Sequence, residues 1–197
     1  MWWRGVPQPL SPLQQRLARA LASRPARTED DPALSRAAVA VILAPNPDAI
    51  LLIRRAERPG DPWSGQMGLP GGRHGVGDAD LLVTAIREAT EEVGIRLEPH
   101  HLVGPLDDVA PRSPHLPPLM VRPYVFALPE RPVVAGNIEV ADHAWVSVEH
   151  LLHPDTYRST RIELGGLSRD FPAYHIGPIP IWGMTERILT PLLQLLS

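Results

Sequence analysis

The chain of 197 residues contains no cysteine and no lysine. The absence of cysteine excludes disulfide bonds and thiolate chemistry. No apolar run approaches the 18 residues that suggest a membrane-spanning helix, so we expect no membrane partner. The first ten residues, MWWRGVPQPL, lack a basic region followed by an apolar one. We therefore expect no secretory signal and a cytoplasmic protein.

The chain has only a small net charge. The 19 basic residues, all arginine, and the 22 acidic residues give a formal charge of −3, which does not indicate a nucleic-acid partner. The 24 prolines are spread through loops and between short apolar segments, where they act as punctuation. A chain of this length is most simply one main domain with a substantial core.

Hydrophobic periodicity and turn residues predict the order of the elements. Helices are expected at residues 13–22, 80–94, 149–152 and 181–196, the last broken near its end by Pro191. Strands are expected at residues 37–44, 49–55, 102–109 and 120–128, and within 137–148, centred on 143–146, with a hairpin joining 160–164 to 168–174. Pro123 places the fourth of these strands at a sheet edge or a bulge. The long loop at residues 56–70 is of the kind that often carries function.

The helix at residues 80–94 carries the strongest pattern in the chain. Asp80 is a suitable N-cap and Gly94 stands where a helix commonly ends. At roughly 100° per residue, one stripe predicts the buried face. That stripe contains Leu82, Ile86, Ala89 and Val93. A second stripe contains Glu88, Glu91 and Glu92, with Arg87 beside Glu91 at the i, i+4 spacing.

Three carboxylates on one helical face repel one another. Such a face is stable when it is fully solvated, or when a cation lies against it. The loop GLPGG before the helix, with Asp78 and Asp80 at the helix entrance, favours the second interpretation. Oxygen ligands without cysteine or clustered histidine suit Mg²⁺ or Mn²⁺. Cations held by carboxylates often act on phosphates, which points to a metal-dependent enzyme.

The segment from Arg87 to Ile95, REATEEVGI, resembles the second half of the Nudix box, and Gly71 and Gly72 resemble its glycine start. The usual box has a glutamate at the position of Ala79; here Asp78 and Asp80 flank it. Together with the preceding segment LLIRRAERPGDPWSGQMGLPGG, this pattern is similar to the coenzyme A pyrophosphatase subgroup. The resemblance implies an α/β fold: a Nudix-type α/β/α sandwich around a mixed β-sheet. It also implies a Nudix hydrolase domain at residues 36–197, after an N-terminal arm and helix at residues 1–35.

The resemblance further implies hydrolysis of a pyrophosphate bond with Mg²⁺ or Mn²⁺. Glu88, Glu91 and Glu92 are the expected metal ligands, and Arg87 is expected to orient Glu91. Glu91 and Arg87 are therefore assigned to the catalytic group. The general base remains open between Glu139, in the segment NIEV, and Asp78.

The phosphate-binding loop is expected at Gly71, Gly72 and Asp78. Guanidinium groups bind phosphates bidentately, and the long loops and strand ends carry several. The expected substrate-binding residues are Arg54, Arg55, Arg58, Gln66 and Arg112. Each single arginine could instead be an ordinary surface charge.

The best match for the substrate is coenzyme A and its esters, cleaved to 4′-phosphopantetheine and adenosine 3′,5′-bisphosphate. ADP-ribose, NADH, a dinucleoside polyphosphate or an oxidised nucleotide is the alternative. A Nudix-fold binding domain without catalysis is a third hypothesis. The partner is in each case a nucleotide-type small molecule. A homodimer is expected from family habit and from Trp2 and Trp3 in the N-terminal arm.

Overall fold

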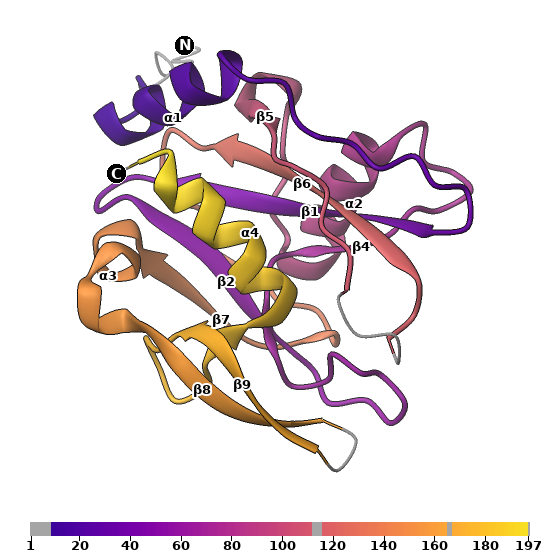
Figure 1. Ribbon diagram of the computed structural model, residues 1–197. Coiled ribbons are helices and arrows are strands. Elements are labelled where there is room, and N and C mark those ends of the chain that lie inside the picture. The colour runs from indigo at the N-terminus through magenta and orange to yellow at the C-terminus, as the bar shows by residue number, and fades with distance from the viewer. Residues whose placement is uncertain (1–8, 112–115, 165–166, 197) are drawn as a thin grey trace.

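The computed structural model describes residues 9–111, 116–164 and 167–196, which form two β-sheets with helices packed around them (Figure 1). The helices are α1 (Pro12–Ala22), α2 (Leu81–Val93), α3 (Val148–Leu152) and α4 (Gly183–Gln194), with 3₁₀ turns η1 (Pro99–His101) and η2 (Pro154–Thr156). The larger sheet contains β1 (Ser35–Ala44), β2 (Ala49–Arg55), β3 (Met67–Gly68), β4 (Gly71–Arg73), β5 (Leu102–Pro105), β6 (Leu119–Ala127) and β7 (Val140–Ser147). The smaller sheet contains β8 (Tyr157–Leu164), β9 (Leu167–Tyr174) and β10 (Ile181–Trp182).

The larger sheet is mixed. Its strand order is β3-β2-β1-β6-β5, with β4 added to β1 and β7 added to β2. β1 runs parallel to β6 along almost its whole length and antiparallel to β2 and β4. β2 pairs with β1 only at the end of β1, where Ala49 and Ile50 lie opposite Ala44 and Leu43. β4 pairs with the other end of β1, where Gly72 lies opposite Ala38. This exchange of neighbours brings the glycine loop onto the central strand.

Helices cover both faces of this sheet. Because successive side chains of a strand point to opposite faces, β1 and β2 contribute to two separate cores. Val41 and Leu43 pack in the core that contains α1 and α4, whereas Ala40 and Ile42 pack in the core that contains α2. The α/β/α sandwich around a mixed sheet is therefore confirmed.

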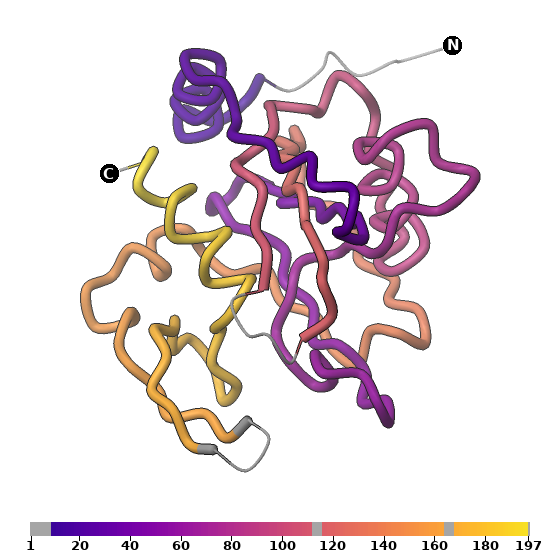
Figure 2. The backbone as a smooth tube through the Cα atoms, turned by 45° about the vertical axis from the view of Figure 1, so that its right-hand side comes forward, coloured from indigo at the N-terminus to yellow at the C-terminus, as the bar shows by residue number. Residues whose placement is uncertain are grey.

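The smaller sheet lies beside this sandwich (Figure 2). β9 is its middle strand, between β8 and β10, and β10 leads directly into α4. The Tyr157 hydroxyl of β8 donates a hydrogen bond to the buried Glu186 carboxylate of α4 at 2.7 Å, which ties the sheet to the sandwich. Among the described residues, no helix has the length and apolar character needed to cross a bilayer.

Most predicted elements are present, and the strand at residues 49–55 has the predicted bounds. Two predictions about strands are wrong. The strand predicted at residues 102–109 ends at Pro105, which cannot donate a further ladder hydrogen bond. The prediction that Pro123 lies at an edge or a bulge is also wrong, because β6 is an interior strand and the irregularity in its pairing with β5 falls between Leu102 and Gly104. The sheet tolerates this proline because β5 ends opposite Tyr124, and the Leu106 N–H then donates to the Pro123 carbonyl at 2.9 Å.

The closing segment also differs from its prediction. Ile181 and Trp182 form β10, and the helix begins only at Gly183. Pro191 does not break this helix, which continues to Gln194. A proline removes one helical hydrogen bond, and here the packing of the buried Leu192 and Leu193 outweighs that loss. The long loop at residues 56–70 contains the short strand β3.

Candidate active site

Helix α2 is fixed at both ends as its sequence predicts. The Asp80 side chain accepts a hydrogen bond from the Val83 N–H at 2.8 Å, and Gly94 ends the helix with a left-handed backbone at φ 69°. The buried face is rotated slightly from the predicted stripe. Leu81, Ala85, Ala89 and Val93 are fully buried, whereas Leu82 and Ile86 are only partly buried. This rotation turns Glu92 toward the sheet.

Glu92 is buried between α2 and the glycine loop. Its side chain is 2% exposed, and its carboxylate accepts a hydrogen bond from the Gly71 N–H at 2.8 Å. Burial raises the pKa of Glu92 to about 7, against the opposing effect of this hydrogen bond, and the nearby charges of Glu88 and Glu139 raise it further. A buried carboxylate with two like-charged neighbours is an environment that favours a proton or a cation.

Glu88 lies one turn earlier and touches the same loop. A Cβ atom on Gly72 would lie only 2.4 Å from Glu88 Oε1, so the carboxylate occupies the space that any other residue would fill. Burial raises the pKa of Glu88, while the guanidinium of Arg87 opposes this shift. Gly71 is equally constrained, because its Cβ would lie 2.4 Å from the Ala38 carbonyl oxygen.

Arg87 is the centre of a hydrogen-bond network. Its Nε and Nη2 donate to the two oxygens of Asp78 at 2.9 and 3.0 Å. Its Nη1 donates to Glu88 at 2.8 Å and to Glu91 at 2.9 Å. The predicted i, i+4 pair with Glu91 therefore exists, but the sequence did not indicate that the bidentate partner of Arg87 is Asp78.

The Asp78 side chain is buried, and both of its carboxylate oxygens accept hydrogen bonds. Besides Arg87, its Oδ2 accepts hydrogen bonds from the Gly75 N–H and the Thr84 hydroxyl, both at 2.9 Å. The Arg87 hydrogen bonds hold the pKa of this carboxyl well below its usual range. Such a weak base is poorly suited to take a proton. Asp78, next to Ala79, instead fixes Arg87 through its two carboxylate oxygens.

Glu91 differs from the other two carboxylates, because its side chain is 55% exposed and bonds only to Arg87 among the contacts described. Within residues 9–111, 116–164 and 167–196, no three histidine or acidic side chains already converge in the geometry of a metal site. The chemistry of the donors nevertheless fits a hard divalent cation, because Glu88 and Glu92 offer carboxylate oxygens in a partly desolvated, negatively charged place.

Three of the four predicted substrate arginines, Arg54, Arg55 and Arg58, have an acidic partner. Arg54 pairs with Glu57 at 3.2 Å and Arg55 with Asp61 at 3.1 Å, and the Nε atoms of both arginines are buried without a hydrogen-bond partner among the described atoms. Arg58 pairs with Glu139 at 3.2 Å. Gln66 donates to the Pro62 carbonyl at 3.1 Å. The predicted Arg112 lies outside the described residues.

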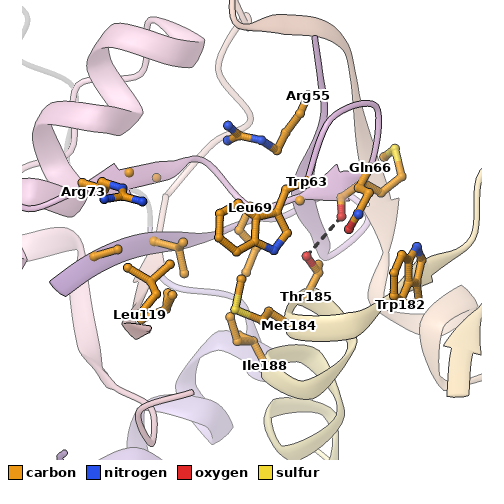
Figure 3. Close-up of a pocket in the computed structure, with 17 residues that line it drawn as sticks. Arg55, Trp63, Gln66, Leu69, Arg73, Leu119, Trp182, Met184, Thr185 and Ile188 are labelled. Carbon is orange, nitrogen blue, oxygen red and sulfur yellow. Dashed lines mark hydrogen bonds between the residues drawn. The ribbon is translucent and has the colours of Figure 1, made fainter. Parts of the chain in front are cut away.

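A cavity of about 180 Å³ opens beside the glycine loop (Figure 3). Gly71, Gly72, Arg55 and Arg73 are among the residues that line it, and the Trp63 ring lies near the middle of the view. The rest of its lining comes from several elements and includes Gln66, Leu119, Trp182, Met184, Thr185 and Ile188. The Thr185 hydroxyl donates to the Met67 carbonyl at 3.1 Å and fixes α4 to β3. Sequence reasoning missed the residues of α4 because no local signal connects them to the box helix.

A helix-borne row of carboxylates, a glycine loop packed against it and an adjoining cavity on a mixed sheet are together the features expected of a metal-dependent phosphoanhydride hydrolase. Residues 34–164 match the NUDIX domain family. The chain therefore belongs to the Nudix family, whose members generally use divalent metal ions and bind nucleotide-type substrates.

Comparison with individual proteins agrees with this assignment. The chain is 37% identical over 133 residues to the uncharacterized protein C14C4.10c of Schizosaccharomyces pombe, covering 64% of this chain but only 40% of that protein. It is 30% identical to the mitochondrial coenzyme A diphosphatase NUDT8 of Mus musculus over 93% of this chain and 88% of the relative. The crystal structure of a MutT/nudix family protein from Enterococcus faecalis has the same fold, with a TM-score of 0.59 at 16% identity over 85% of this chain and 63% of the other.

Proposed function

We propose that this Nudix hydrolase is a diphosphatase of coenzyme A and its esters, releasing 4′-phosphopantetheine and adenosine 3′,5′-bisphosphate. The observation that carries the hydrolytic part is the contact of Glu88 and Glu92 with the Gly71–Gly72 loop beside an open cavity. Support for the substrate comes from the similarity to the mouse coenzyme A diphosphatase, which extends over 93% of this chain.

Glu88 and Glu92 would hold Mg²⁺ or Mn²⁺, with Glu91 as a further ligand once it separates from Arg87. When bound, the metal neutralises the diphosphate and stabilises the charge that develops as water attacks phosphorus. Arg87, itself fixed by Asp78, orients the carboxylates of Glu88 and Glu91. Glu139 is the proposed acceptor of the proton that the attacking water loses.

The arginines around the site supply the remaining charge. Arg55 and Arg73 lie at the cavity, and Arg54 and Arg58 lie on or near the same strand end. Coenzyme A carries a ribose 3′-phosphate in addition to the diphosphate, so one guanidinium beyond those that bind the bridge is needed. Trp63 offers an aromatic face in the cavity for the adenine ring.

Product analysis with coenzyme A, ADP-ribose and NADH side by side, with and without Mg²⁺, tests this proposal. We expect coenzyme A to have the highest kcat/KM, to yield the two named products, and to remain intact in EDTA. Much faster turnover of ADP-ribose or NADH would overturn the substrate assignment while leaving the reaction class intact. Absence of any metal-dependent hydrolysis would overturn the enzymatic assignment itself.

A further inference from the structure

Arg58 and Glu139 belong to two segments that lie side by side at the edge of the site. The Ala56 N–H donates to the Glu139 carbonyl at 2.8 Å, where β2 pairs with β7. The Glu139 N–H donates to the Asn137 side chain at 2.7 Å, and the Asn137 N–H donates to the Glu92 carbonyl at 3.0 Å. The backbone of Glu139 is thus anchored to both β2 and α2, while its side chain remains half-exposed.

Glu139 follows Asn137 by two residues, so the Asn137–Glu92 backbone hydrogen bond places it beside the C-terminal part of α2. In agreement with this position, burial raises the pKa values of Glu88 and Glu92, and the charge of Glu139 is a further, smaller contribution in the same direction. The partner of Glu139 in the ion pair is Arg58. The backbone of Arg58 is also anchored, because its N–H donates a hydrogen bond to the Ser64 hydroxyl at 2.8 Å. The half-exposed Glu139 carboxylate therefore pairs with Arg58, while its backbone is anchored beside the helix that carries Glu88 and Glu92.

The other ion pairs of this region differ from this one. The Arg55–Asp61 pair is more enclosed, with side chains 29% and 18% exposed, and both the Arg54–Glu57 and Arg55–Asp61 pairs join residues that are close in sequence. The Arg58–Glu139 pair is 46% and 42% exposed and connects the long loop at residues 56–70 to the segment that precedes β7. An exposed pair of this kind is weak, and a phosphate can replace the carboxylate on a guanidinium.

We propose that substrate binding exchanges this ion pair: a phosphate of the diphosphate takes Arg58 and releases the Glu139 carboxylate toward the box helix. In this arrangement Arg58 is occupied by Glu139 until an anionic substrate arrives, so substrate binding and the freeing of Glu139 are coupled. The inference rests on the proposed phosphoanhydride hydrolysis, but it holds for any diphosphate substrate and does not depend on coenzyme A.

A double-mutant cycle on anion binding tests the exchange without turnover. The dissociation constant of inorganic pyrophosphate is measured by calorimetry in EDTA for the wild type, Glu139→Gln, Arg58→Gln and the double variant. Because Glu139 competes with the anion for Arg58, we expect Glu139→Gln to tighten binding about two- to fivefold. We expect Arg58→Gln to weaken it by at least a similar factor, and the gain from Glu139→Gln to vanish in the Arg58→Gln background.

The double variant separates exchange from simple charge removal. If Glu139→Gln tightened binding equally with and without Arg58, the effect would be general electrostatics and the exchange would be refuted. Unchanged binding in Glu139→Gln, or no pyrophosphate binding by any of the four proteins, would refute it as well.

Asp170→Asn, which breaks the exposed Arg161–Asp170 pair on the β8–β9 hairpin, is the matched control and should bind like the wild type. The substrate panel remains an independent test of the proposed function.

Discussion

At the scale of single residues, the site depends on one guanidinium that holds three carboxylates. Arg87 joins Asp78, Glu88 and Glu91, and it also donates to the Arg73 carbonyl at 3.2 Å. Asp78 does not belong to α2, so its bidentate pair with Arg87 connects the helix to the loop before it. A change at Asp78 should therefore reach Glu88 and Glu91 through Arg87, which donates hydrogen bonds to all three carboxylates.

Asp78→Asn is expected to lower the free energy of unfolding by about 2 kcal/mol, because a neutral amide bonds the partly buried Arg87 more weakly than a carboxylate does. Since the folded-state pKa of Asp78 is depressed, its contribution to stability is present above the unfolded pKa of about 3.9 and is lost as the pH falls below it. Urea denaturation should therefore show a constant difference between wild type and variant from pH 8 to 5, and a shrinking difference below pH 4.

The surface pair Arg161–Asp170 provides the control for this measurement, because both of its side chains are well exposed. Asp170→Asn should leave the free energy of unfolding nearly unchanged, because an exposed pair contributes little to stability. A wild-type advantage over Asp78→Asn that stayed unchanged down to pH 3 would show that the carboxylate's ionisation is not what stabilises the loop.

The sequence predicts which residues carry the chemistry of the site better than it predicts which residues they contact. Glu88, Glu91 and Glu92 share a helical stripe by local geometry alone. The burial of Glu92 depends on Gly71, and the pairing of Arg58 with Glu139 depends on how β7 adds to β2. Such contacts join distant parts of the chain, and a single sequence carries no local signal for them.

At the scale of elements, the contact of α2 with β4 determines the site. The helix and its two end residues could be predicted because capping and periodicity are local. The two-residue strand β3 could not, because β3 exists only by pairing with Ile53 and Arg54 of β2. The same holds for Pro123, whose tolerance depends on where β5 ends.

Gly72→Ala is expected to displace the Glu88 carboxylate, since the new Cβ would lie 2.4 Å from Glu88 Oε1. A side chain can turn away at small cost, so we expect the free energy of unfolding to change by less than about 1 kcal/mol. Misplacing a catalytic ligand by about 1 Å can cost roughly 100-fold in rate. The measurement is kcat/KM for coenzyme A hydrolysis together with urea denaturation.

Gly77→Ala is the matched control for this prediction. A Cβ atom on Gly77 meets no described atom within 4 Å, and the residue belongs to the same glycine-rich segment before α2. It should retain the wild-type rate. If Gly72→Ala also retained that rate, the position of Glu88 against the loop would be irrelevant to catalysis.

At the scale of the whole molecule, three distant parts of the chain meet at the cavity. Trp63 comes from the loop after β2, Leu119 from the start of β6, and Thr185 from α4 (Figure 3). The fold class could be predicted from the order of strands and helices and from the box. The placement of α4 over the sheet face opposite α2 could not, because it depends on the path of the β8–β9 hairpin and β10 (Figure 1).

The stability of the whole chain should respond to divalent metal through Glu92. A ligand that binds only the folded state at 100 times its dissociation constant adds about 2.7 kcal/mol. For a chain of this size that corresponds to a rise in Tm of roughly 5 to 10 °C. We expect such a rise for the wild type when EDTA is replaced by Mg²⁺ or Mn²⁺. Glu92→Gln should lose most of it, because the amide keeps an acceptor for the Gly71 N–H but removes the charge beside Glu88.

Glu149→Gln, at an exposed glutamate of α3, should respond like the wild type. An equal rise in all three proteins would mean that the metal binds elsewhere than on the box helix.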